Sequence, residues 1–312
     1  MNKYYIYILI FCNTIFSQEI IGEGLDSNNL INYLQNNYKT STTLSYNDAR
    51  DILYGNIDKI NGSVYCVYTN YSVTLPNNVD PSSHLYDNGM NCEHLWPQSM
   101  FEIITTNHMK SDMHHLRPCK ENVNSSRGNK PFNEINDLQT DNWYWLNNNL
   151  SNIPSSNINE YSESKSGDFE PREDKKGDVA RAMFYFYTIY ENEADDIFFE
   201  DQKNILLDWH NMDSVTQEEI DRTYLIASYQ NNIPNPFILD STLINRCYFN
   251  IYNMGDINED GLINITDVVV LVNYIVGNMN LNNNQLNLAD TNQDGLINVI
   301  DIIQLVNTII GE

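Results

Sequence analysis

Apolar residues recur at helical spacing in three stretches of the chain. In 27–38 (SNNLINYLQNNY) they fall three or four positions apart, which predicts an amphipathic helix. Residues 177–190 (GDVARAMFYFYTIY) are apolar on nearly every side, which predicts a buried helix capped by Asp178. Residues 215–230 open with a Thr-x-x-Glu capping box and continue at helical spacing, so we expect a third helix there.

One stretch instead follows the two-residue period of a strand. Residues 62–69 (GSVYCVYT) alternate β-branched, aromatic and small side chains, which predicts a β-strand. Helices that flank a few strands predict an α+β fold. No Ser/Gly-rich or Pro-rich linker divides residues 18–250. We therefore expect them to form one domain.

The first 17 residues, MNKYYIYILIFCNTIFS, have the pattern of a signal peptide, with Lys3 before an apolar run that ends in small and polar residues. The run is too short to span a bilayer. We therefore expect an exported protein, secreted, periplasmic or held at the cell surface. An oxidising compartment allows up to two disulfides, or buried free thiols, among the four later cysteines, Cys66, Cys92, Cys119 and Cys247.

The net charge of −25 argues against a nucleic-acid partner, but the charge is unevenly distributed. Residues 254–312 contain eight acidic residues and no Lys or Arg. Residues 92–132 contain five basic residues against four acidic ones, together with four of the six histidines. The chain therefore has one locally cationic segment.

The acidic tail is a duplication. Residues 256–277 and 290–311 align without gaps and are identical at 13 of 22 positions, with Gly261 and Gly295 at the sixth place of each loop and an apolar helix after it. EF-hand-type loops take calcium on oxygen atoms at positions 1, 3, 5, 7 (a backbone carbonyl), 9 and 12. We expect two calcium sites in a small all-α domain, 254–312, with the ligands Asp256, Asn258, Asp260, Leu262, Asn264 and Asp267, and Asp290, Asn292, Asp294, Leu296, Asn298 and Asp301.

Over 254–311 this tail resembles the type I dockerin module of bacterial extracellular enzymes. The resemblance implies that calcium folds the module and that a cohesin-type scaffold protein binds it. Two features set it apart from a calmodulin-like sensor: position twelve is Asp instead of Glu, and no clear helix precedes each loop. The positions expected to face the partner, Ile265–Thr266 and Val299–Ile300, are more apolar than the small hydroxyl residues common in the family.

The segment NCEHLWPQSM (91–100) places Glu93 directly before His94. Strict alternation would send the two side chains to opposite faces of a strand, so we expect the strand to end or bulge by Pro97. His94 could be structural, or a base that activates water beside a magnesium ion held by oxygen ligands. A zinc site is a further alternative, without an HExxH motif to support it, drawing on His94, His108, His114, His115 and Cys119.

The other groups that phosphodiester hydrolysis needs lie in DMHHLRPCKENVNSSRGNKPF, 112–132. Asn124 offers a second magnesium ligand, and the guanidinium groups of Arg117 and Arg127 offer contacts to phosphate. A helical turn through this segment puts Asn124 and Arg127 on one face.

These segments, with FEPREDKKGDVARAMFYFY (169–187) and LLDWH…NPFI (206–238), resemble the bacterial endonuclease I family across about 45–240. The resemblance implies a helix-rich domain with a ββα-metal (His-Me finger) active site. It implies His94 as general base, a single magnesium ion on Glu93 and Asn124, and Arg127 on phosphate. The implied reaction is cleavage of DNA, often of RNA too, with little sequence preference and with 5′-phosphate ends.

Two other functions remain open at this point. The chain could be a catalytically inactive, calcium-dependent scaffold or adhesion protein, or a metal-dependent phosphatase or phosphodiesterase acting on small substrates. The joint presence of Glu93, His94 and Asn124 favours the nuclease, which we expect to be a monomer without a membrane span. We also expect Trp96 to pack beneath the motif. A group of four acidic residues could be a second metal site or a solvated loop. Its members are Asp168, Glu170, Glu173 and Asp174.

Overall fold

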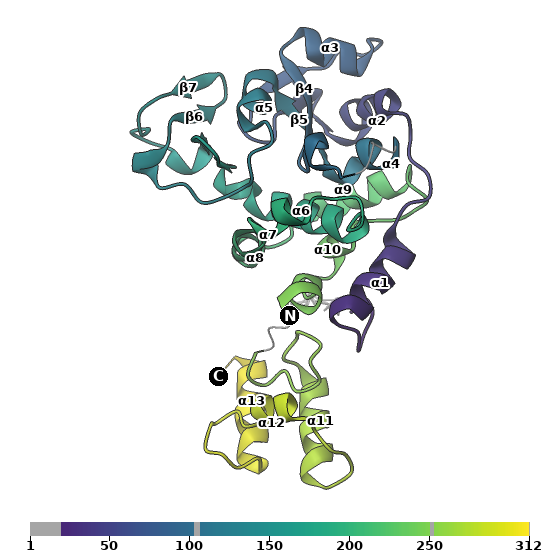
Figure 1. Ribbon diagram of the computed structural model, residues 1–312, viewed down its shortest axis with the longest axis vertical. Helices are drawn as coiled ribbons and strands as arrows, with labels where there is room; N and C mark the ends of the chain where they lie inside the picture. Colours follow the sequence, from purple (N-terminus) through teal and green to yellow (C-terminus); the bar gives the residue numbers. More distant parts are fainter. Residues whose placement is uncertain (1–19, 103–106, 250–252, 312) are drawn as a thin grey trace, which may run out of the picture.

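The computed structural model describes residues 20–102, 107–249 and 253–311, so the expected signal peptide at 1–17 lies outside the described residues. Buried apolar side chains form two separate clusters. The larger includes residues from Ile21 to Cys247, and the smaller is centred on Ile257, Leu271, Ala289 and Leu305. Figure 1 shows the second cluster's helices as a separate group at the C-terminal end. Within the described ranges no helix is long and apolar enough to cross a membrane.

The larger part combines helices with three small antiparallel sheets, which confirms the predicted α+β class. Its helices are α1 (Ser27–Tyr38), α2 (Tyr46–Ile52), α3 (Pro81–Asp87), α4 (Asn107–Ser111), α5 (Glu121–Arg127), α6 (Lys176–Ile189), α7 (Asp196–Glu200), α8 (Lys203–Met212), α9 (Gln217–Ala227) and α10 (Pro236–Leu239). The sheets have the orders β1-β2-β3, β4-β5 and β7-β6-β8-β9. Their strands are β1 (Lys59–Ile60), β2 (Ser63–Tyr65), β3 (Ser72–Thr74), β4 (Met90–His94), β5 (Leu116–Lys120), β6 (Asn142–Trp145), β7 (Asn148–Leu150), β8 (Ser162–Ser164) and β9 (Phe169–Glu170).

The three predicted helices are present as α1, α6 and α9. The capping box of α9 is formed, with Thr216 and Glu219 each bonding the other's backbone N–H. The predicted cap of α6 is wrong, because Asp178 lies inside its first turn and Lys175 occupies the N-cap position. Asp178 instead forms ion pairs with Lys175 and Arg181, at 3.1 and 3.7 Å.

The strand predicted over 62–69 is shorter than expected. Only β2 pairs in the sheet, and the chain turns immediately afterwards, with the Cys66 N–H donating to the Tyr71 carbonyl at 2.7 Å. Asn70 completes the turn with φ of +57°, a value that Asn tolerates better than most residues. The alternation of side chains was therefore a poor guide to where this strand ends.

The segment around Glu93 and His94 forms a two-stranded hairpin followed by a helix. Strand β4 ends at His94, as predicted, and pairs antiparallel with β5 in a register that places Glu93 opposite Arg117. Helix α5 begins directly after β5 and buries Val123 and Arg127. The hairpin and α5 thus hold both halves of the motif side by side.

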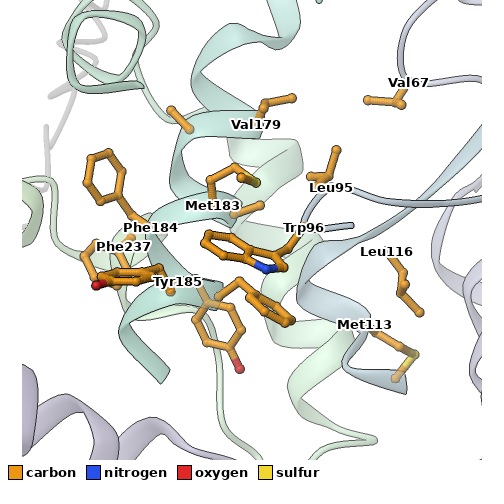
Figure 2. Close-up of a cluster of buried hydrophobic side chains, with 14 of the residues drawn as sticks. Val67, Leu95, Trp96, Met113, Leu116, Val179, Met183, Phe184, Tyr185 and Phe237 are labelled. Carbon is orange, nitrogen blue, oxygen red and sulfur yellow. The ribbon is translucent and has the colours of Figure 1, made fainter. Parts of the chain in front are cut away.

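Helix α6 supports the chain just beyond β4. Trp96 is fully buried, and its indole ring stacks on Phe186 and Tyr187 with ring centroids 5.2 and 5.9 Å apart. Figure 2 shows Trp96 among the apolar side chains of α6, which include Met183. Trp96 therefore packs beneath the motif, as the sequence predicted, and holds the chain in place just after β4 ends.

The tail contains α11 (Ile265–Ile275), α12 (Asn283–Ala289) and α13 (Val299–Ile310). Helices α11 and α13 follow the two loops, as predicted. The expectation that no helix clearly precedes either loop is wrong for the second, since α12 ends just before Asp290. Three helices around a small apolar cluster make this part all-α.

Candidate active site and calcium loops

The imidazole of His94 is held at the end of β4, with Nε2 bonded to a backbone carbonyl and Nδ1 facing the side chain of Gln98. Its Nε2 lies 3.0 Å from the Lys110 carbonyl, which can only accept, so Nε2 carries the proton. The Nδ1 lone pair then faces the Gln98 amide at 3.4 Å. Burial lowers the pKa of His94 to about 4, and the charges of Lys110, Arg127 and Arg50 add to the effect. His94 is therefore neutral near pH 7, the form that can accept a proton.

Two aromatic rings fix the plane of His94. The Tyr46 ring is stacked on it at a centroid distance of 5.3 Å, and the His115 ring meets it edge-on at the same distance. His115 is itself fixed by a 2.8 Å hydrogen bond between Nε2 and the Met109 carbonyl. This packing leaves His94 little freedom to rotate.

Glu93 is a buried carboxylate with one oxygen free. Its Oε1 accepts a 2.8 Å hydrogen bond from the Tyr68 hydroxyl and lies 3.5 Å from Arg127 Nη1. Its Oε2 has no hydrogen-bond partner among the residues described. Burial raises the pKa of Glu93 to about 7, although Arg127 and Tyr68 act in the opposite direction. A bound cation would stabilise the ionised form.

Asn124, on α5, presents its amide oxygen close to Glu93 and His94. Its Nδ2 donates to the Asn91 side chain at 2.7 Å and to the Cys92 carbonyl at 3.0 Å, both on β4. Its Oδ1 has no partner among the described residues. Helix α5 is thereby tied to β4, and the amide oxygen is oriented away from the strand.

Glu93, His94 and Asn124 all line one hollow of about 430 Å³, together with Cys92, Pro97, Gln98, Ser99, Gly128 and Asn129. A carboxylate oxygen and an amide oxygen, both without partners, suit magnesium, which takes few protein ligands and keeps several waters. Among the described residues, the five zinc candidates supply no group of three His, Cys, Asp or Glu side chains placed to hold a metal. The zinc alternative therefore has no support in the geometry.

Arg127 is not placed to contact substrate, contrary to expectation. Its side chain is fully buried, and its two Nη atoms donate to the carbonyls of His94 and Leu95, at 3.2 and 2.5 Å. The guanidinium also lies over the Phe132 ring. Arg127 thus braces the end of β4 and the Glu93 carboxylate.

Arg117 lies outside the hollow. It lines a different cavity, of about 520 Å³, and its Nη1 donates to the carbonyls of His114 and Leu116. Burial lowers the pKa of Arg117 to about 10, with the neighbouring Arg222 adding to the effect. The predicted role of Arg117 on the scissile phosphate does not fit this position.

The acidic group at 168–174 is solvated in part: Glu173 and Asp174 are exposed, as expected of a solvated loop, whereas Glu170 is buried. All four carboxylates have a cationic partner. Asp168 pairs with Lys165, and Asp174 pairs with Arg172. Glu170 and Glu173 both lie 2.8 Å from the Lys176 ammonium. The group is a network of ion pairs at the start of α6.

Sequence reasoning missed the residues that hold this site in place. Tyr68 fell inside a predicted strand, and Tyr46 belongs to a short helix that had no marked periodicity. Gln98 lies within the quoted motif, but nothing in its type suggested a bond to His94. The Lys110 contact uses a backbone carbonyl, which leaves no trace in residue type.

The four cysteines among the described residues are buried free thiols. Cys66 and Cys119 lie close together, with their sulfur atoms 3.9 Å apart. Cys92 lies beside Tyr46 and Tyr54, and neither Cys92 nor Cys247 has a hydrogen bond to another cysteine sulfur. Among the described residues, Cys66 and Cys119 are therefore the pair best placed to form a disulfide.

The duplicated loops have matching geometry. Asp256 accepts backbone N–H bonds from Asp260 and Gly261, and Asp290 accepts the equivalent bonds from Asp294 and Gly295. Both glycines have φ near +85°, the left-handed region that suits glycine. Burial raises the pKa of Asp256 to about 7, with the nearby Asp267 adding to the effect. A cation would relieve this crowding of carboxylates.

Positions nine and twelve of each loop also start the following helix. Asn264 and Asn298 are the N-caps of α11 and α13, in capping boxes with Asp267 and Asp301. The Oδ1 atoms of Asn264 and Asn298 accept hydrogen bonds from the N–H groups of Thr266 and Ile300, in the first turn of each helix. Leu262 and Leu296 occupy the seventh position of the two loops, where a backbone carbonyl is the expected calcium ligand.

Comparison with known families agrees with this arrangement. The family model described as Endonuclease I matches residues 26–242. The chain belongs to the endonuclease I family. The model described as Dockerin type I domain matches residues 254–310 of this endonuclease I family member.

Two curated relatives are extracellular ribonucleases, from Bacillus subtilis (strain 168) and Bacillus amyloliquefaciens. Each is 34% identical over 163 residues, which covers 47% of this chain and 50% of the relative. The chain thus spans about half the length of the curated relatives it matches.

Proposed function

We propose that the protein is an exported, magnesium-dependent endonuclease with little sequence preference. The observation that carries the proposal is the convergence of three groups on one hollow: His94 Nδ1, Glu93 Oε2 and Asn124 Oδ1. The hairpin of β4 and β5 followed by α5 has the order of a ββα-metal (His-Me finger) site. Both named relatives are ribonucleases. The test below therefore uses RNA as well as DNA, the substrate that the family resemblance implies first.

In this mechanism His94 is the general base. Its Nδ1 takes a proton from a water whose oxygen forms a bond to phosphorus as the bond from phosphorus to the 3′ oxygen breaks. The departing 3′ oxygen gains a proton from solvent, and the phosphate stays on the 5′ side. Glu93 and Asn124 would hold magnesium, which when bound supplies positive charge to the phosphate oxygens and the departing oxygen.

The other residues of the site keep this base in position. The Lys110 carbonyl and the Tyr46 and His115 rings hold His94 so that Nδ1 faces the hollow. Tyr68 and Arg127 occupy Glu93 Oε1 and leave Oε2 for the metal. Each of these contacts is made without substrate, so the site is organised in advance.

A nicking assay tests the proposal. Supercoiled plasmid and a single-stranded RNA are incubated with the full-length protein and magnesium, with and without EDTA. We expect cleavage that EDTA abolishes and that His94→Ala lowers by a factor of about 10² to 10⁴. His84→Ala, a histidine on α3 outside the hollow, is the matched control and should cleave normally. A parent that cleaves neither polymer, or an equally active His94→Ala, would sink the proposal and favour an inactive scaffold protein.

For the tail we propose a calcium-dependent docking module that places the nuclease on a cohesin-type scaffold. The support is an exposed apolar surface that the module itself does not cover. Ile265 and Val269 are exposed on α11, Val276 is exposed just after it, and Val299 and Ile303 are exposed on α13, all more than half accessible. Ile265 and Val269 lie four residues apart on one face of α11, as Val299 and Ile303 do on α13, and exposed apolar faces of this kind mark binding sites. Capture of the full chain by an immobilised cohesin in calcium, lost in EGTA, is the expected result, and no capture in calcium would contradict it.

A further inference from the structure

Most Lys and Arg side chains are neutralised by a carboxylate within ion-pair distance. Among the residues described, six have no such partner: Arg50, Lys59, Lys110, Arg117, Lys120 and Lys130. Four of these six are connected to residues that line the hollow: Arg50 and Lys110 through the contacts of His94, and Lys120 and Lys130 through the segment that carries Asn124 and Asn129. In a protein with a net charge of −25, free cations at that place need an explanation.

Two of them, Arg50 and Lys110, lie over one aromatic ring. The Arg50 guanidinium and the Lys110 ammonium are each 4.7 Å from the centroid of Tyr46, whose ring is stacked on His94. Cations are attracted to an aromatic face, and the ring also fixes where these long side chains lie. Helices α2 and α4 thus deliver two positive charges to the side of the general base.

Arg50 is only partly satisfied by the protein. Its Nη2 donates to the Asn47 side chain at 2.7 Å, and its Nε is buried without a hydrogen-bond partner in the described structure. A half-buried guanidinium with N–H groups to spare is suited to the oxygens of a phosphate. Lys110 keeps its backbone carbonyl on His94 and leaves its ammonium free of any carboxylate.

The cations expected to bind phosphate are occupied elsewhere. Arg127 is buried on the carbonyls of β4, and Arg117 lines another cavity. We propose that Arg50 and Lys110, positioned by Tyr46, contact the phosphate groups of a bound nucleic-acid strand beside His94. This inference rests on the nuclease function proposed above. Tyr46 is a positioning residue in it.

Two further cations without a carboxylate partner lie next to the segment that lines the hollow with Asn124 and Asn129. Lys120 is the N-cap of α5, the helix that carries Asn124. Lys130 directly follows Asn129, a residue that lines the hollow. Their ammonium groups bond only to neutral groups, Asn147 and Ser164, at 2.7 and 2.6 Å. A polyanionic strand bound at the hollow would therefore have Lys120 and Lys130 nearby in addition to Arg50 and Lys110.

The salt dependence of binding tests the role of Arg50 and Lys110. A fluorescently labelled single-stranded oligonucleotide is titrated with His94→Ala protein at several sodium chloride concentrations, so that binding is measured without cleavage. Loss of one phosphate contact lowers the slope of log K against log salt by about 0.7 for single strands. We expect that loss for Arg50→Gln and for Lys110→Gln, and about twice that loss for the double variant. Arg50→Lys keeps the charge and should keep the slope.

Lys203→Gln is the control, because Lys203 also lies over an aromatic ring, Phe249, but pairs with Glu200 away from the hollow. Its slope should equal that of the parent. In the cleaving protein, Arg50→Gln and Lys110→Gln should raise KM by about 10-fold and leave most of kcat, the behaviour of a contact made equally in the ground and transition states. Tyr46→Leu, which removes the ring that positions both cations, should also raise KM.

Unchanged slopes in variants that melt at the parental temperature would overturn the inference and leave the nuclease proposal intact. A parent that binds no oligonucleotide and cleaves no plasmid would overturn both. Equal losses for Lys203→Gln and Lys110→Gln would show a general charge effect and would also overturn the inference.

Discussion

Glu93 and Arg127 form a buried ion pair beneath the hollow, with 3.5 Å between Oε1 and Nη1 and side-chain exposures of 2% and 0%. The pair explains how a carboxylate can be kept in an apolar setting next to His94, the proposed general base. It also changes the role expected of Arg127, because a guanidinium that supports Glu93, the proposed metal ligand, from beneath is not free to hold substrate. Its Nη atoms donate to three carbonyls and its guanidinium lies over an aromatic ring, while its Nε has no hydrogen-bond partner among the described residues.

We therefore predict that Arg127→Met lowers the free energy of unfolding by about 3–5 kcal/mol, since removing one partner leaves a buried charge uncompensated. Activity should fall through kcat, because Glu93 and the end of β4 lose their support. Urea unfolding and steady-state kinetics measure the two effects. Arg127→Lys restores the charge and should recover part of the stability. A variant of normal stability whose only defect is a raised KM would instead support the original phosphate contact.

The sequence carried enough information to predict the local parts of this site. Glu93, His94 and Asn124 belong to motifs whose spacing is short, and the helices around them follow the period of their own residues. The supports could not be predicted in the same way. Tyr46 and Tyr68 reach the site only through packing between distant segments, and Arg127 has the same residue type whether it is exposed or buried. Which arginine faces substrate is decided by tertiary structure.

A second prediction concerns Cys66 and Cys119, which in an oxidising compartment should form a disulfide. Their sulfurs need to move from 3.9 Å to a bond length of about 2.05 Å. Burial raises the pKa of the Cys66 thiol, but hydrogen bonds from Cys119, Thr69 and the Lys120 amide outweigh it and lower the pKa to about 6. The thiolate is the form that attacks a disulfide carrier protein, which takes up the two electrons.

Peptide mapping of the exported protein without reduction should find the Cys66–Cys119 link, with Cys92 and Cys247 as free thiols. The link closes a loop of 53 residues, for which chain entropy gives about 4 kcal/mol of stabilisation. Cys119→Ser should therefore lower the melting temperature of the oxidised protein, and Cys247→Ser should lower it less. Four free thiols in protein collected outside the cell would contradict the prediction.

A third prediction concerns Glu163, a buried carboxyl on β8 that accepts a hydrogen bond from the Thr140 hydroxyl. Burial raises the pKa of Glu163 to about 8, and the cross-strand neighbour Glu170 adds to the effect. Between the unfolded pKa of about 4.3 and the folded value, the folded state binds more protons than the unfolded state. The contribution of Glu163 to stability is therefore full at low pH and is lost as the pH rises towards 8.

Glu163→Gln removes this titration while keeping the shape and an acceptor for Thr140. Relative to the parent, its free energy of unfolding should rise between pH 5 and pH 8.5 by on the order of 2 kcal/mol. Urea unfolding at the two pH values gives the difference directly. Glu200→Gln, which alters an exposed carboxylate on α7, is the control and should show almost no such change. A Glu163→Gln difference that is constant with pH would show that Glu163 is ionised in the folded state throughout.

The last prediction concerns metal removal from the tail. The loops place Asp256, Asp260 and Asp267 close together, and burial and mutual repulsion raise the pKa values of Asp256 and Asp267. Without a cation this arrangement is unfavourable, and the small apolar cluster of the tail has little other support. Adding EGTA to the full-length protein should therefore reduce its helical circular dichroism and expose 254–312 to protease.

Asp256→Ala and Asp290→Ala should each remove one calcium ion from a stoichiometry of two measured by calorimetry, and the surface variant Asp208→Ala should keep both. Because the nuclease part has its own core, cleavage in magnesium should persist in EGTA; an equal loss of cleavage would mean that calcium also supports the active site.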